Sequence, residues 1–306
     1  MSQESDFKRQ DLEKRKVCLQ EEIEAVSRQI NSTLSAVDRV RLERHKEDLF
    51  RQFDRLESQL SQLGTPKPNP PNNFANPFQP LNGRIEQSEQ FFNRERELRD
   101  IFDFLNAGSG VELLGDRQIG KSSVLQQIKH RAASALRLER KPIYLNLQEV
   151  HTEIEFYASL CEKLEMATCK GYSFFRAMRD RRVLLLLDEA EKMSWDGFTR
   201  EVREQLRSLA EGENAPLRLV VAARTPLDRL FPDSHESGMT SPFQGICVRV
   251  ELNTWHRETV QRFIISKLEN TGVCFSDAEI EKLWQDSQGH PQKLMKACFD
   301  LYRQYR

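Results

Sequence analysis

Residues 115–122 read Gly115-Asp116-Arg117-Gln118-Ile119-Gly120-Lys121-Ser122, and this stretch decides the fold. It satisfies the pattern G-x-x-x-x-G-K-[ST] in full. It follows the apolar run Val111–Leu114 and precedes a helical run over 123–129, which is the strand–loop–helix setting that a phosphate-binding loop (P-loop) requires. Its glycines let backbone amides curve around phosphate oxygens, and the helix N-terminus adds a favourable dipole.

This loop predicts a site for ATP or ADP with Mg²⁺. Lys121 is expected to reach the β- and γ-phosphates and to assist catalysis, and Ser122 is expected to ligate Mg²⁺. The residues expected to contact the nucleotide here are Gly115, Asp116, Arg117, Gln118, Ile119, Gly120, Lys121, Ser122 and Ser123.

A second motif supplies the acidic residues that such a site needs. The apolar run Val183–Leu187 ends in Asp188-Glu189, which is a Walker B pattern. We expect Asp188 to hold Mg²⁺ through water and Glu189 to orient or activate the attacking water.

A third apolar run, Leu219–Ala223, ends at Arg224. Polar residues that follow parallel strands lie at the edge of the sheet where ligands bind. Arg224 is therefore a candidate sensor of the γ-phosphate, and an ordinary surface arginine is the alternative interpretation.

Short apolar runs alternate with helical stretches from residue 84 onward, which predicts an α/β fold with a parallel sheet flanked by helices. We expect a P-loop NTPase core over 84–253 and a helical lid over 254–306. The expected strands are Val111–Leu114, Pro142–Leu147, Val183–Leu187, Leu217–Ala223 and Val248–Leu252.

The first 63 residues contain neither Gly nor Pro and carry apolar residues at steps of 3, 4 and 7. This heptad seam predicts an α-helical coiled-coil hairpin over 1–63, in which Ser35 and Asp38 resemble a capping box that opens the second helix. One continuous helix is the alternative. Residues 64–83 hold six of the twelve prolines and predict a linker, which Phe74 and Phe78 could pin to the next domain.

Composition excludes several classes of protein. The net charge of −1 provides no global positive field for nucleic acid. No apolar run approaches the ~18–20 residues of a membrane span, and the N-terminus shows no secretory signal. The six cysteines form no C-x-x-C pair, so we expect reduced thiols and a cytoplasmic location.

An ordered set of motifs resembles the STAND class of signal-transduction ATPases, within the AAA+-like P-loop proteins and closest to their archaeal-type and bacterial nucleotide-switch branch. The set covers roughly residues 84–306. Its members are Phe92–Leu98, the P-loop, Leu187–Glu189, Ala223–Leu227, Ser241–Phe243 and Gly289-His290-Pro291.

The resemblance implies roles for three residues. Arg94 would lie near the adenine, Arg224 would contact the γ-phosphate, and Pro291 would pack on the base. The hairpin also resembles the helical effector-associated regions found before such ATPases in bacteria. Taken without the resemblance, Gly289-His290-Pro291 is a helix start with Pro291 at a suitable position.

Three functions fit the sequence. The favoured one is a nucleotide-controlled signalling switch and slow ATPase, whose N-terminal hairpin associates with itself or with a protein partner. The alternative is an AAA+ ATPase that acts on DNA, like transposition regulators or origin loaders, with Arg200, Arg203 and Arg207 as arginine-finger candidates. A third is a scaffold that binds nucleotide without hydrolysing it.

Overall fold

The computed structural model describes residues 12, 15, 16, 19, 20, 22, 23, 25–27, 29, 30, 36–62, 76–231, 243, 245–269 and 271–305. The chain forms two compact units, Met1–Pro70 and Pro71–Arg306. Each unit is described by itself.

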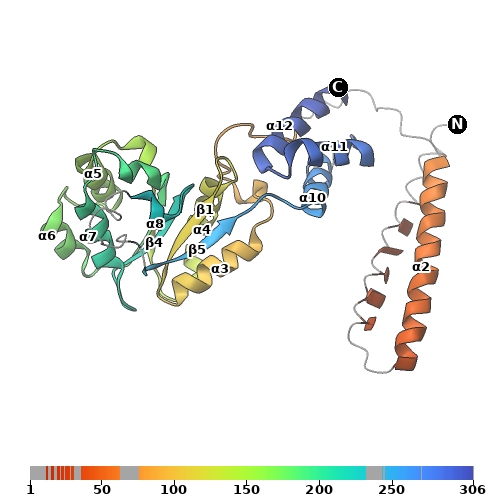
Figure 1. Ribbon diagram of the computed structural model, residues 1–306, viewed down its shortest axis with the longest axis horizontal. Helices are drawn as coiled ribbons and strands as arrows, with labels where there is room; N and C mark the ends of the chain where they lie inside the picture. The colour runs from red at the N-terminus through yellow and green to blue at the C-terminus, as the bar shows by residue number, and fades with distance from the viewer. Residues whose placement is uncertain are drawn as a thin grey trace. The chain divides into compact units, whose positions relative to one another are not determined.

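The second unit is built on one five-stranded parallel sheet in the order β2-β3-β4-β1-β5 (Figure 1). All residues of β3 and β4 are buried, as expected for parallel strands that are covered on both faces. The strands are β1 (Gly110–Gly115), β2 (Lys141–Asn146), β3 (Val183–Asp188), β4 (Leu217–Ala223) and β5 (Cys247–Leu252). The predicted α/β fold is confirmed, and each strand matches its predicted run within one residue at either end.

Helices cover both faces of this sheet, because alternate strand residues point to opposite sides. In β3, Leu184 and Leu186 pack with α3 (Glu95–Asn106) and α4 (Lys121–Ala135). Leu185 and Leu187 pack on the other face with α5 (Glu153–Lys163), α6 (Gly171–Met178) and α7 (Arg200–Ala210). The shorter elements are η1 (Ser88–Gln90), η2 (Leu147–Glu149), η3 (Ala190–Ser194) and α8 (Leu227–Leu230).

The predicted helical lid follows β5 and has its own apolar core. It consists of α10 (Arg257–Leu268), α11 (Asp277–Ser287), α12 (Pro291–Tyr302) and η4 (Arg303–Tyr305). A capping box between Ser276 and Glu279 begins α11. Among the described residues, no helix has the length and apolar character that crossing a membrane requires.

The last part of the predicted linker is built into the lid. Phe78 is fully buried and lies 5.9 Å from Phe275 and 6.2 Å from Phe263 between ring centroids. Asn76 donates a side-chain hydrogen bond to the carbonyl oxygen of Phe299 (3.1 Å). Residues 76–83 therefore belong to the folded second unit, while Phe74 lies outside the described residues. Phe78 thus packs on the next domain, as the sequence suggested. Prolines exclude helix and central strand, but they do not exclude an ordered extended segment.

The first unit contains two packed helical stretches. Described residues between 12 and 30 are helical, and α2 (Ala36–Gln62) follows. Val26, Ile30 and Leu49 form a buried cluster. The ammonium of Lys16 lies 5.0 Å from the ring centroid of Phe53, whereas one continuous helix would place these residues roughly 55 Å apart. The chain therefore reverses as the hairpin requires, although Ser35 of the predicted capping box lies outside the described residues.

Candidate nucleotide-binding site

The P-loop joins β1 to α4 as predicted, and two of its glycines are required by the backbone. Gly120 has φ of 108°, a conformation that a residue with a side chain adopts only with strain. A Cβ added at Gly115 would lie 2.8 Å from Cγ2 of Ile119 and 3.1 Å from the carbonyl oxygen of Leu252. The loop therefore needs glycine at one position for its conformation and at the other for close packing.

The side chain of Lys121 turns back onto the P-loop. Its side chain is buried, and its Nζ donates to the carbonyl oxygens of Gly115 (2.7 Å) and Asp116 (2.9 Å). Burial lowers the pKa of the ammonium, while the charges of Glu191, Glu189 and Asp188 act in the opposite direction. A phosphate would offer this cation a full negative charge in place of two carbonyl dipoles, as the predicted role requires.

Asp188 ends β3 at the same edge of the sheet and is almost fully buried. Its Oδ1 accepts from the backbone N–H of Glu189 (3.0 Å), and its Oδ2 accepts from the hydroxyl of Tyr144 (2.7 Å). Burial and the charge of Asp188 raise the pKa of Tyr144 well above its usual range, so this hydroxyl remains a donor. Two hydrogen bonds thus fix the carboxylate that is predicted to hold Mg²⁺ through water.

Glu189 and Arg224 face each other beside Asp188. Because β4 lies between β1 and β3, the residue that follows β4 sits between the P-loop and the Walker B residues. Nη2 of Arg224 is 4.0 Å from Oε2 of Glu189, and Nε of Arg224 is 3.8 Å from Oε1 of Glu191. Arg224 therefore lies beside the Walker B residues, and its role as a γ-phosphate sensor stays a prediction.

Glu191 was not predicted, yet it organises the turn after β4. Its carboxylate accepts from the backbone N–H groups of Arg224 and Thr225. The only signal in the sequence was a second acidic residue two positions after Glu189.

A strap formed by residues 80–94 borders the site from the N-terminal side. Its Ile85 backbone N–H donates to Oγ of Ser123 (2.9 Å), so the strap is bonded to the first turn of α4. The Arg84 guanidinium lies 4.9 Å from the ring centroid of Tyr144 and donates to its hydroxyl (3.4 Å). Arg84 thereby contacts Asp188 through Tyr144, and no motif in the sequence pointed to either residue.

Arg94 lines the cavity, but its guanidinium is already engaged. It donates to Oε1 of Glu97 (2.7 Å) and to the carbonyl oxygen of Asn253 (2.5 Å), and the side chain is buried. These bonds join the start of α3 to the chain just after β5. In the structure Arg94 thus links α3 to the chain after β5, and its contact with adenine stays a prediction.

The lid reaches the P-loop through the Gly289-His290-Pro291 turn. A Cβ added at Gly289 would meet the carbonyl oxygen of Trp255 at 2.0 Å, and Gly289 has φ of 69°. Nε2 of His290 lies 3.0 Å from the carbonyl oxygen of Arg117, which assigns the hydrogen to Nε2. The sequence gave His290 no role, but the structure makes it a direct contact between lid and loop.

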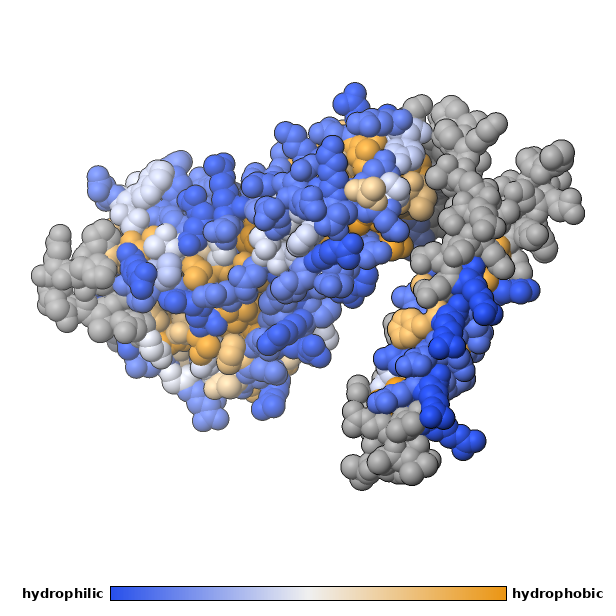
Figure 2. All heavy atoms as spheres, turned by 45° about the vertical axis from the view of Figure 1, so that its right-hand side comes forward, coloured by the Kyte–Doolittle hydropathy of each residue, from blue (hydrophilic) through white to orange (hydrophobic). Residues whose placement is uncertain are grey.

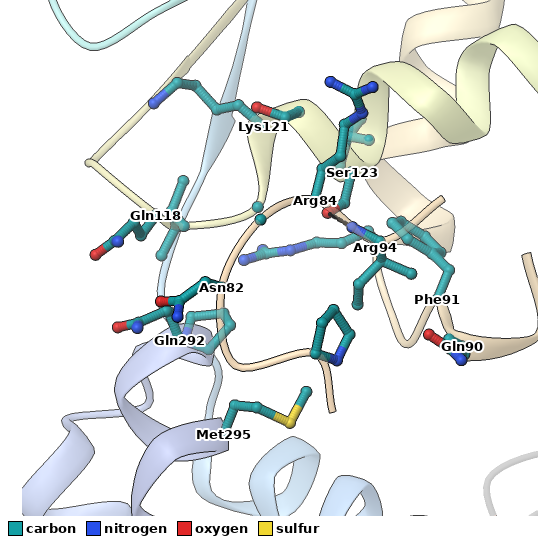
Figure 3. A pocket seen from close by; sticks show the side chains of 18 of the residues that line it. Asn82, Arg84, Gln90, Phe91, Arg94, Gln118, Lys121, Ser123, Gln292 and Met295 are labelled. Carbon is teal, nitrogen blue, oxygen red and sulfur yellow. Dashed lines mark hydrogen bonds between the residues drawn. The ribbon is translucent and has the colours of Figure 1, made fainter. Parts of the chain in front are cut away.

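These parts enclose one cavity of about 400 Å³, a size suited to a small-molecule ligand. Figure 3 shows Gln118 of the P-loop, Asn82 of the strap, and Gln292 and Met295 of α12 around it. Other residues that line the cavity are Arg84, Phe91, Arg94, Gly120, Lys121, Ser122, Ser123, Tyr144, Asp188, Glu189, Trp255 and Pro291.

The donor set suits Mg²⁺. Ser122 and Asp188 line the same cavity and offer hydroxyl and carboxylate oxygens, the ligands that this hard cation prefers. Tyr144 leaves Asp188 with unused lone pairs for a metal-bound water, because each carboxylate oxygen accepts more than one hydrogen bond.

Comparison with known proteins agrees with this geometry. The Walker-type ATPase PABY2304 of Pyrococcus abyssi has a TM-score of 0.56 and 19% identity, over 74% of this chain and 71% of its own. The ORC2 protein of Aeropyrum pernix, solved as ADPNP-ADP complexes, has a TM-score of 0.54 and 15% identity, over 75% of this chain and 66% of its own. The chain has the fold of the P-loop NTPases.

The N-terminal unit matches a separate family. Residues 2–63 match the family described as Effector-associated domain 9. A search of curated proteins gives no match. The helical hairpin expected from the heptad seam thus coincides with the residues that this family matches.

Proposed function

We propose that this protein is an ATP-binding signalling switch of the STAND type, in which the bound nucleotide controls association through the N-terminal hairpin. The observation that carries the proposal is the shared wall of the cavity. P-loop, Walker B, strap and lid residues all line it, and His290 of the lid bonds directly to the loop. A nucleotide in this cavity would therefore touch the P-loop, the Walker B residues, the strap and the lid together.

The hairpin is the proposed output of the switch. It forms a compact unit of its own and matches an effector-associated domain. Its inner apolar residues Val26, Ile30 and Leu49 are buried within the hairpin, so a partner has to use its outer face. Phe50 on that face is 45% exposed.

Slow hydrolysis would reset the switch. Glu189 would take a proton from the attacking water, Lys121 and Arg224 would stabilise charge on the transferred phosphoryl group, and Asp188 would hold Mg²⁺ through water. Ser122 would ligate the Mg²⁺ ion, which would neutralise charge on the phosphates. The distance of 4.0 Å between Nη2 of Arg224 and Oε2 of Glu189 supports these paired roles.

The alternative of a DNA-acting AAA+ ATPase loses one of its arginine-finger candidates. Arg203 is 3% exposed, donates to the carbonyl oxygen of Met193 and stacks on Phe231, so it cannot reach into a neighbouring subunit. Arg200 pairs with Glu204 and Arg207 with Glu211 along α7. These contacts are typical of a solvated helix face.

Size-exclusion chromatography with light scattering tests the switch. The full chain should change its mass or its elution between ADP and a non-hydrolysable ATP analogue. The Lys121→Ala variant should show one state under both conditions. Identical behaviour of the wild-type chain with ADP, with the analogue and without nucleotide would contradict nucleotide-controlled association.

A further inference from the structure

Basic residues outside the nucleotide site gather at the amino-terminal ends of β2 and β3. Residues 131–141 contain four Arg or Lys and one Glu, and residues 176–182 contain four Arg and one Asp. Each segment thus carries a net charge of +3 (four minus one) in a chain whose net charge is −1. The backbone N–H of Lys141 donates to the carbonyl oxygen of Arg182 (2.8 Å), so the two segments meet.

The place where they meet is hollowed and lies at the end of the sheet opposite the P-loop. Arg140, Lys141 and Arg182 line the hollow together with Ala133, Pro142 and a single acidic residue, Glu139. We call residues 131–141 and 176–182 around this hollow the basic edge.

Two arginines are buried beneath the basic edge without a carboxylate partner. Arg140 and Arg218 are 6% and 2% exposed. Arg140 donates to the carbonyl oxygens of Ala215 (3.0 Å) and Pro216 (3.2 Å), and Arg218 donates to those of Gly212 and Glu213. Burial, with the nearby charges of Arg218 and Arg182, lowers the pKa of Arg140 to about 10. Buried charges are usually paired, so carbonyl dipoles alone leave positive potential here.

Four more arginines add exposed charge. They are Arg137, Arg176, Arg179 and Arg182, and in the part of the chain that the structure describes their side chains have no ion pair or hydrogen bond. Two other members of the basic edge are compensated, since Arg131 pairs with Glu95 and Lys141 with Glu165. The uncompensated charge is therefore carried mainly by guanidinium groups.

We propose that the basic edge binds the phosphate backbone of a nucleic acid duplex without reading its sequence. Guanidinium groups match phosphate oxygens in pairs of hydrogen bonds. Leu138 is the one large apolar side chain exposed in residues 131–141, and residues 176–182 expose none. A protein partner would need apolar or aromatic anchors, and a single strand would need aromatic side chains for stacking, whereas duplex backbone binding needs charge alone. This inference does not depend on the proposed switch.

Fluorescence anisotropy with a labelled DNA duplex of arbitrary sequence tests the proposal on the full chain. Four neutralised phosphates predict a slope of about −3.6 in the plot of log K against log salt concentration, at about −0.9 per phosphate. Arg137→Gln/Arg179→Gln/Arg182→Gln should weaken binding at low salt at least about tenfold and leave a slope of about −0.9, from Arg176 alone. A variant with the same charge change on the lid, Lys293→Gln/Lys296→Gln/Arg303→Gln, should bind like the wild-type chain.

Three results would overturn the proposal. They are no binding by the wild-type chain at low salt, equal losses in the two triple variants, and competition by polyglutamate as effective as competition by unlabelled duplex. The last result would point to an acidic protein. Unchanged ATP affinity of each variant shows that its fold is intact, and if the triple variant does not fold, each single arginine substitution should still reduce the slope by about 0.9.

Discussion

At the scale of single residues, Lys121 is the group on which nucleotide binding depends most. Its ammonium is held at the mouth of the loop by two carbonyl oxygens, which a phosphate would replace. We expect Lys121→Ala to weaken ATP binding by about 100-fold or more, because a hydrogen bond to a charged group contributes up to about 3 kcal/mol. Isothermal titration calorimetry measures this directly. Unchanged affinity would show that the loop does not bind the phosphates.

Glu189→Gln separates binding from chemistry. The amide keeps the shape and the hydrogen-bonding capacity of the carboxylate but cannot accept the proton of water. ATP affinity should therefore stay within a few-fold of wild type, while turnover falls by about 10²–10⁴. Phosphate release under single-turnover conditions gives the rate. Equal rates in the two proteins would place the base elsewhere or favour a scaffold that does not hydrolyse ATP.

The residues found from the sequence are those whose role is set by local spacing. The P-loop, Asp188 and Glu189 follow directly from strand–loop patterns, so the parallel sheet brings them to one edge. Arg84 and Tyr144 act through a contact between residues 60 positions apart, which no local pattern records. Arg203 looked exposed because its neighbours on α7 are charged, yet it turns inward and stacks on Phe231.

At the scale of elements, the turn between α11 and α12 couples the lid to the loop. Gly289 has no room for a side chain beside Trp255, and the backbone N–H of Trp255 donates to the Gly289 carbonyl oxygen (2.8 Å). We expect Gly289→Ala to displace this turn and with it the contact from His290 to Arg117. The variant should show both a lower melting temperature and weaker ATP binding. Thermal unfolding with and without ATP measures the two effects.

Pro291→Ala is the matched comparison on the same turn. Alanine is tolerated at the first position of a helix, so the fold should be unchanged, and the variant should lose only the packing on the base that is predicted for Pro291. ATP affinity should fall by less than about tenfold, or ~1.4 kcal/mol, and discrimination against GTP should decrease. Full affinity together with no base preference in the wild-type chain would leave Pro291 as a helix start alone.

Element boundaries followed from the sequence wherever hydrophobic runs were long. The central strands β3 and β4 were found because parallel strands buried on both faces are apolar at nearly every position, whereas the edge strands β2 and β5 are partly exposed. The strap had no predicted role, because ordered extended chain without periodicity looks like a linker. Its packing reveals it through Ile85, which is bonded to Ser123, while Phe78 just before the strap lies in the lid core as the sequence suggested.

At the scale of the whole molecule, the hairpin and the ATPase unit should be separable, but only at the right boundary. A chain that begins at Pro71 keeps Asn76 and Phe78, whereas one that begins at Arg84 loses an aromatic ring buried in the lid core. Loss of such a ring costs about 3–5 kcal/mol. The Pro71 chain should therefore bind ATP like the full protein, and the Arg84 chain should unfold at lower temperature. Equal melting temperatures of the two would mean that Phe78 does not stabilise the lid.

Substitutions within the hairpin test how it acts. The heptad seam packs inside the hairpin, so it does not offer a surface to a partner. Val26 and Leu49 pack inside the hairpin, so aspartate at either position should unfold it, which circular dichroism of the isolated segment 1–70 would detect. Figure 2 shows a mainly hydrophilic hairpin surface with small hydrophobic patches on the side in view. An exposed aromatic residue is a natural contact for a partner. Phe50→Asp should leave the hairpin folded and the ATP affinity unchanged, because Phe50 is 45% exposed, but should remove ATP-dependent association in light scattering. Glu47→Gln, an exposed position on the same helix, is the control and should associate normally. If Phe50→Asp and the Pro71 chain both associate like the wild-type chain, then association does not pass through the hairpin, and the ATPase unit itself has to supply the contact.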